Sequence, residues 1–110
     1  MTCGMIEVGA EKLPAYECRP DTPPQAAVFL TFEVSGLTDF IKDVTWRLTN
    51  ENQYLALAPD WLHGLPGAAP QERVPALTDE IFAKRVETVL SFLESLGKIG
   101  FRRQRRFTGR

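Results

Sequence analysis

The feature that most limits how this chain can fold is the run AAVFLTF at residues 26–32. It is almost unbroken in its apolar character, and no polar residue alternates with the apolar ones. A strand with one solvent-exposed face alternates apolar and polar residues, whereas a strand that is buried on both faces is apolar throughout. A second short run, YLALA at residues 54–58, is of the same kind. The two runs predict strands of a parallel sheet that helices cover.

The segment between these runs predicts a helix. Thr38 is suited to be its N-cap, and Asp39 places an acid in its first turn. One helical face is formed by apolar residues at the required spacing, namely Leu37, Phe40, Ile41, Val44 and Leu48. Trp46 falls off this stripe, and we expect it to cover an edge of the sheet.

A second helix is predicted to begin at residues 78–80. Its apolar stripe is Phe82, Val86, Val89, Leu90 and Leu93, and Gly97 is well placed as its C-terminal cap. Residues 98–101 are then expected to begin a third core strand. Residues 61–74, which are rich in glycine and proline and lack periodicity, are expected to be a loop.

The N-terminal residues 5–8 and 13–19 predict an antiparallel hairpin at a sheet edge, where Pro14 would be tolerated. In its second strand Leu13, Ala15 and Glu17 fall on one face, and Tyr16 and Cys18 on the other. The whole pattern is that of an α/β domain, with an N-terminal hairpin, a mostly parallel sheet and flanking helices.

The charge of the chain is divided unevenly. Residues 1–101 hold 8 Lys and Arg against 14 Asp and Glu, whereas residues 102–110 hold five arginines and no acid. The length of 110 residues fits one small domain. The two cysteines, Cys3 and Cys18, have no metal-ligand spacing, and we interpret them as small buried or half-buried side chains. With no apolar run long enough to span a membrane and no signal peptide, a cytoplasmic location is expected.

Three stretches together resemble the dienelactone hydrolase family of α/β-hydrolases. Residues 28–37 look like that family's strand and its turn before the first helix. Residues 43–62 are similar to the family's helix followed by a strand that ends in Ala-Leu-Ala-Pro-Asp. Residues 6–20 match its N-terminal hairpin, with a second strand reading Leu-Pro-Ala-Tyr and then Arg-Pro. The resemblance implies a partial α/β-hydrolase fold over residues 1–101.

The resemblance also implies that the strand at residues 99–101 should lead into the nucleophile elbow, a tight turn that exposes Cys or Ser above the sheet. Arg102 stands at the nucleophile position here, and arginine cannot attack a carbonyl because its guanidinium stays protonated. The family's catalytic Asp and His would follow further on. We therefore expect a truncated or frame-disrupted hydrolase that is not catalytically competent, with a disordered basic tail at residues 102–110.

Two site residues follow from the resemblance. Glu33 corresponds to an active-site carboxylate of the family, and the backbone N–H of Val34 to a donor of the oxyanion hole. A solvated or helix-capping carboxylate is the alternative for Glu33. Asp60 is expected to shape the turn after Pro59, and His63 to be a surface imidazole. The two tryptophans, Trp46 and Trp61, are expected to be packing residues.

Two other functional classes stay open. A non-catalytic protein could bind nucleic acid or an acidic partner through the arginine tail, although we expect nucleic acid to be an improbable partner. A split protein could associate with a separate C-terminal half, or with itself, through the apolar sheet edge left open after the third core strand. Complete relatives would act on a small ester or lactone, and we expect no cofactor, no metal and no membrane partner.

Overall fold

The computed structural model describes residues 1–31 and 37–96 of the chain. It opens with the hairpin of strands β1 (Thr2–Val8) and β2 (Leu13–Arg19), whose register runs from Thr2 opposite Arg19 to Val8 opposite Leu13. β1 therefore begins before the predicted residue 5. The turn needs glycine at position 9, because its φ is 75° and a Cβ there would lie 2.4 Å from Cγ2 of Thr88.

Strand β3 (Ala27–Phe29) and strand β4 (Leu55–Pro59) are parallel, with Ala27 opposite Leu55 and Phe29 opposite Leu57. All five residues of β4 are buried, as the continuous apolar run predicts. The backbone N–H of Leu30 extends the pairing by donating to the carbonyl oxygen of Leu57 at 2.9 Å. The two buried parallel strands are therefore confirmed.

Helix α1 (Asp39–Asn52) connects the two parallel strands, and the Thr38 hydroxyl caps it by accepting from the N–H of Ile41 at 3.3 Å. The cap is confirmed, but the predicted apolar stripe is partly wrong. Phe40 is 63% exposed, and the buried face instead passes through Ile41, Thr45 and Thr49. These threonines tolerate burial because their hydroxyls donate to the carbonyl oxygens of Ile41 and Cys18.

The prediction of a mostly parallel sheet is wrong for the part of the chain that the structure describes. The strand order is β1-β2-β4-β3; the β1–β2 and β2–β4 pairs are antiparallel, and the β3–β4 pair alone is parallel. The short turn of the hairpin forces β2 to run against β1, and β2 then pairs with β4. The third parallel strand expected at residues 98–101 lies outside the described residues. Pro14 lies in β2, which is an inner strand and not the edge.

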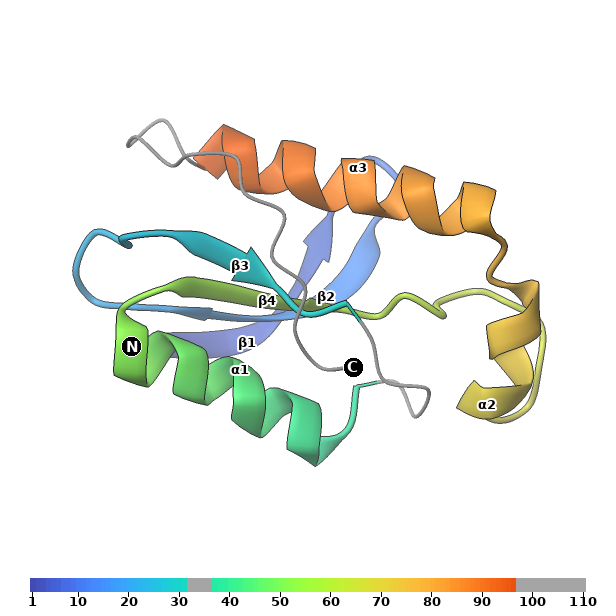
Figure 1. Ribbon diagram of the computed structural model, residues 1–110, viewed down its shortest axis with the longest axis horizontal. Helices are drawn as coiled ribbons and strands as arrows, with labels where there is room; N and C mark the ends of the chain where they lie inside the picture. The colour runs from blue at the N-terminus through green and yellow to red at the C-terminus, as the bar shows by residue number, and fades with distance from the viewer. Residues whose placement is uncertain (32–36, 97–110) are drawn as a thin grey trace.

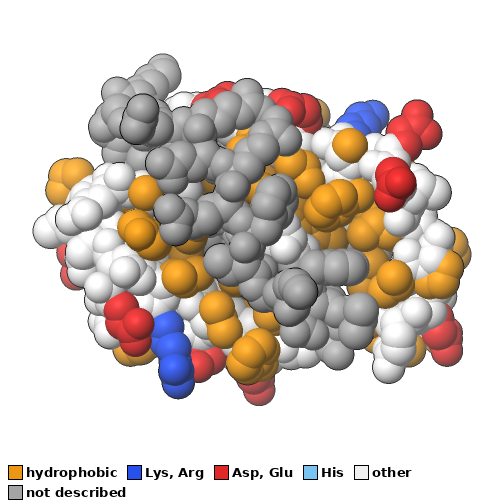
Figure 2. Space-filling view, viewed as in Figure 1, with side chains coloured by type: hydrophobic (Ala, Val, Ile, Leu, Met, Phe, Trp, Pro, Cys, Tyr) orange, Lys and Arg blue, Asp and Glu red, His pale blue; other side chains and the backbone are white. Residues whose placement is uncertain are grey.

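The sheet lies between two helices, as Figure 1 shows, with α1 on one face and the long helix α3 (Asp79–Leu96) on the other. α3 buries Val86, Val89, Leu90 and Leu93 of its predicted stripe. The larger core cluster forms between α3 and the sheet, and a smaller one forms beneath α1. In Figure 2 apolar side chains gather in the middle of the face between the two helices, and charged ones lie toward the rim. The α/β layering is therefore confirmed.

Two short helical turns lie within or directly after residues 61–74, the segment predicted to be a loop. These are α2 (Pro70–Arg73) and a 3₁₀ helix (Val74–Ala76). Pro70 opens α2, at a position where its missing N–H costs no helical hydrogen bond. Turns this short have no apolar periodicity to detect, so the sequence pattern did not reveal them.

The two cysteines are half-buried and buried, as interpreted from the sequence, but they also form a disulfide, which the sequence interpretation did not include. Cys3 and Cys18 are direct partners in the β1–β2 register, and their Cα atoms are 4.1 Å apart. Cysteines directly opposite one another on adjacent strands point to the same face, which brings their sulfur atoms together. No helix within residues 1–31 and 37–96 is long and apolar enough to cross a membrane. The cytoplasmic location stays a prediction, and disulfides are rare in that compartment.

Candidate functional site

The carboxyl ends of the parallel strands β3 and β4 lie at the same edge of the sheet. In α/β proteins this edge is where ligands bind, because the loops that follow the strands meet there. The indole N–H of Trp61, just after β4, donates to the carbonyl oxygen of Leu30, just after β3, at 2.9 Å. The two strand ends are therefore held together by a buried hydrogen bond.

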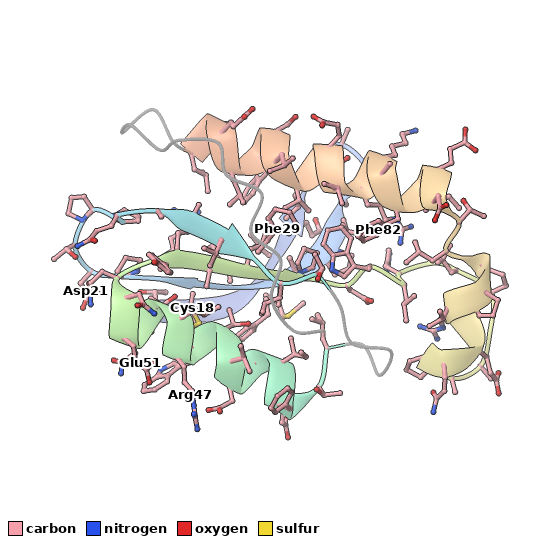
Figure 3. The ribbon with its side chains drawn as sticks, in the orientation of Figure 1. Cys18, Asp21, Phe29, Arg47, Glu51 and Phe82 are labelled. Atoms are coloured by element: carbon pink, nitrogen blue, oxygen red, sulfur yellow. A yellow bond between two sulfur atoms is a disulfide. The ribbon has the colours of Figure 1, made fainter. Side chains whose placement is uncertain are left out.

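Trp61 also packs within an aromatic cluster beneath α3. Its ring centroid lies 6.1 Å from that of Phe29 in β3 and 5.1 Å from that of Phe82 in α3. Figure 3 shows Phe29 and Phe82 in the space between the sheet and α3. Tilted rings at these separations contribute both apolar burial and favourable edge-to-face contacts. Trp61 is thus a packing residue, as predicted.

Asp60 shapes the turn that leads from β4 to Trp61, as the sequence predicts. Its side-chain oxygen Oδ1 accepts from the backbone N–H of Leu62 at 3.3 Å, and its carbonyl oxygen accepts from that of His63 at 3.2 Å. The N–H of Asp60 itself donates to the carbonyl oxygen of Pro14 at 2.8 Å. The His63 side chain is exposed, which agrees with the prediction of a surface imidazole.

Arg85 of α3 holds the same turn from the other side, and sequence reasoning did not single it out. Its two terminal nitrogens donate to the carbonyl oxygens of Trp61, at 2.5 Å, and His63, at 2.9 Å. Its Nε is buried without a hydrogen-bond partner among the described residues. The sequence signal that could have identified Arg85 was its position three residues after Phe82, which places it on the side of the helix next to the core. The turn is fixed from both β3 and α3.

Helix α1 begins at the same edge. Leu37, just before the helix, packs in the cluster that contains Leu30, Ile41 and Ala58. Leu30, which precedes segment 32–36 by two positions, and Leu37, which follows it directly, are therefore packed in one apolar cluster. The N-terminus of a helix carries partial positive charge, which favours an anion nearby.

Glu33 and Val34, the two predicted site residues, lie outside the described residues. Their positions and roles stay predictions. The arginine tail at residues 102–110 and the expected elbow at residues 100–102 also lie outside them. The described part of the chain holds no group of three or more His, Cys, Asp and Glu side chains that could bind a metal ion.

A buried carboxylate lies away from this edge, in β2. The side chain of Glu17 is 7% exposed, and its Oε1 accepts from Nε of Arg19 at 2.8 Å. Its Oε2 has no hydrogen-bond partner among the described residues. The hydrogen bond to Glu17 raises the pKa of Arg19, burial lowers it by a smaller amount, and the charge of Glu17 raises it further.

Comparison with known proteins supports the fold. No family model matches the sequence, and no curated protein matches it. Among solved structures, the fold is similar to that of a "Putative Dienelactone Hydrolase" from Klebsiella pneumoniae subsp. pneumoniae, with a TM-score of 0.76 and 25% identity over 87% of this chain. This chain spans 45% of the length of that protein. The described fold is therefore of the α/β-hydrolase kind.

Proposed function

We propose that this chain provides the N-terminal part of an ester- or lactone-hydrolysing enzyme of the dienelactone hydrolase type, and that it does not hydrolyse esters by itself. The observation that carries the proposal is the shared edge of β3 and β4. There the Trp61–Leu30 hydrogen bond joins the strand ends, and α1 begins. The likeness to the Klebsiella protein supports it.

In this proposal Glu33 is an active-site carboxylate and the N–H of Val34 is an oxyanion donor. Segment 32–36 runs from the end of β3 to Leu37, which packs against Ile41 in the first turns of α1. A backbone N–H that is fixed at such a place can stabilise the negative charge that forms on a carbonyl oxygen during ester cleavage. The packing of Leu30 and Leu37, which flank the segment, in one apolar cluster supports this role, because an oxyanion donor must be in position before the reaction.

The nucleophile, the orienting Asp and the His base would come from residues outside this sequence. Both of its cysteines are joined in the disulfide, so neither provides a thiolate. Cys18 is also fully buried. Arg102, which stands at the expected nucleophile position, has no attacking lone pair. The substrate of the completed enzyme would be a small ester or lactone.

Hydrolysis of p-nitrophenyl acetate by the purified chain tests whether the chain is silent on its own. We expect the rate to equal that of the same chain after heat denaturation. Without an organised active site, the nucleophilic side chains of the chain should give the same background rate of hydrolysis in the folded and the denatured state. Saturable hydrolysis by the folded chain that the Glu33→Gln substitution removes would contradict the proposal. It would show a complete active site that includes Glu33.

A further inference from the structure

Strand β1 is the outermost strand of the sheet, and no described element pairs with its outer edge. An unpaired edge presents backbone donors and acceptors in a row, and many proteins protect such an edge with proline, lysine or a bulge. Residues 2–8 contain neither proline nor lysine, and Glu7 is their one charged residue. The strand pairs with β2 without interruption over all seven of its residues, so no bulge disturbs it.

The register of the hairpin shows which residues face outward along the backbone. The Cα atoms of Cys3 and Cys18 are 4.1 Å apart, a separation typical of a pair that exchanges no hydrogen bonds. Because such pairs alternate with hydrogen-bonded ones, Cys3, Met5 and Glu7 direct their N–H and C=O groups away from β2. The partner of Glu7 is Pro14, which has no N–H to donate. The outer edge of β1 therefore presents the backbone N–H and C=O groups of three alternate residues, which an antiparallel strand can pair with.

This edge is self-complementary. If a second copy of β1 pairs antiparallel about a two-fold axis through Met5, all seven residues of each strand are paired. Met5 then lies opposite Met5 of the partner subunit, and Cys3 lies opposite the partner's Glu7. Glu7 of one copy is therefore not opposite the partner's Glu7, so no like charges face each other across the two strands.

Two exposed apolar side chains belong to the α1 side of the sheet, Met5 of β1 and Trp46 of α1. Met5 is 51% exposed, and Trp46 of α1 is 43% exposed. Met5 is opposite Tyr16, whose ring lies 5.6 Å from Nζ of Lys42. Trp46 follows Lys42 by four residues and so lies on the same side of α1. The expectation that Trp46 covers an edge of the sheet stays a prediction, and a large part of its ring is in contact with solvent.

We propose that β1 is a homodimer interface, in which two copies of this chain join their sheets through antiparallel β1 strands with Met5 at the two-fold axis. The interface gains backbone hydrogen bonds and buries the Met5 side chains of both copies. The disulfide fixes β1 to β2, so the edge is ordered before the partner binds. This interface is distinct from the edge after the third core strand, which lies outside the described residues.

Sedimentation equilibrium of the oxidised chain over a dilution series tests the interface. The expected mass at high concentration is twice 12.4 kDa, falling toward 12.4 kDa on dilution. Met5→Lys and Met5→Glu are each expected to give monomers, because each places two like charges opposite each other at the axis. An equal mixture of the two variants is expected to restore the dimer, since lysine then faces glutamate.

Phe40→Lys is the matched control, because Phe40 is, after Met5 and Trp46, the third large exposed hydrophobic side chain among the described residues and lies on a different side of α1 from Trp46. It is expected to leave the dimer unchanged. A wild-type chain that is monomeric at every concentration would overturn the proposal. So would a dimer that persists in both Met5 variants while circular dichroism shows them folded, or a mixture of the variants that stays monomeric.

Discussion

The indole N–H of Trp61 and the carbonyl oxygen of Leu30 form a buried hydrogen bond of 2.9 Å that ties the end of β4 to the end of β3. These residues lie 31 positions apart in the sequence, on either side of the α1 crossover. The bond holds the sheet edge that the proposed function requires. The stability that this bond contributes can be measured even without any catalytic activity.

Trp61→Phe is expected to lower the free energy of unfolding by about 1–3 kcal/mol, because it leaves the Leu30 carbonyl without its donor in a buried place. Trp46→Phe is the matched control, since Trp46 makes no described hydrogen bond and is partly exposed, and it should change the value by less than about 0.5 kcal/mol. Urea denaturation followed by circular dichroism measures both. Equal effects of the two substitutions would show that the hydrogen bond contributes little.

Arg85→Met is expected to destabilise the chain by about 1–2 kcal/mol, because the carbonyl oxygens of Trp61 and His63 both lose their donor. The apolar stem of methionine keeps most of the packing of the arginine side chain. Lys84→Met, at an exposed position of the same helix, is the control. Faster proteolysis after residue 60 in the Arg85 variant alone would locate the effect in the turn, whereas equal unfolding free energies of the two variants would contradict it.

Arg19→Ala is expected to cost about 1 kcal/mol, because it leaves the buried Glu17 carboxylate without its ion-pair partner and Arg19 itself is half exposed. The control is Arg47→Ala, which breaks the exposed Asp43–Arg47 pair and should cost less than about 0.5 kcal/mol. Urea midpoints of the two variants measure the difference. A larger loss at the exposed pair would contradict the account.

The contribution of Arg19 should not vary with pH near neutrality. Its pKa is raised in the folded state by the hydrogen bond to Glu17. Stability from this charge is therefore present at every pH below the ordinary arginine value and is lost only as the pH rises through the raised one. The stability difference between wild type and Arg19→Ala should be the same at about pH 7 and about pH 9. A stability difference that becomes smaller from the lower to the higher of these pH values would contradict a raised pKa of Arg19.

Reduction of the Cys3–Cys18 disulfide is expected to lower the unfolding free energy by up to about 3 kcal/mol, since the bond closes a loop with a sequence separation of 15. Thermal unfolding with and without a dithiol reductant measures the change. The Cys3→Ser, Cys18→Ser double variant should not respond to the reductant. If the wild type does not respond either, the bond does not constrain the unfolded chain.

Local patterns in the sequence were sufficient to predict much of the fold. Continuous apolar runs located β3 and β4, and the Thr38 cap located the start of α1. Sheet direction was mispredicted because it depends on which strands become neighbours, and the β2–β4 pairing is a long-range contact. Phe40 was misplaced because the buried face of α1 includes Thr45 and Thr49, whose polarity hid it from a search for apolar residues.

The candidate site was less accessible to sequence reasoning. The turn role of Asp60 could be predicted because an Asp side chain bonds to a backbone N–H close by in the chain. The hydrogen bonds of Arg85 and Trp61 could not, because they join residues that the fold brings together from separate elements. The Cys3–Cys18 bond was missed for the same reason, since it follows from the hairpin register.

The central claim is that this chain carries the oxyanion side of a hydrolase site. The direct test is the rate of p-nitrophenyl acetate hydrolysis when this chain is co-expressed with the remaining C-terminal part of the Klebsiella protein. That protein's own N-terminal part serves as the reference. We expect the Val34→Ala assembly to hydrolyse the ester and the Val34→Pro assembly, which lacks the N–H, to be about 100-fold slower. Equal rates for the two variants, or an assembly that forms without activity while the reference is active, would contradict the claim.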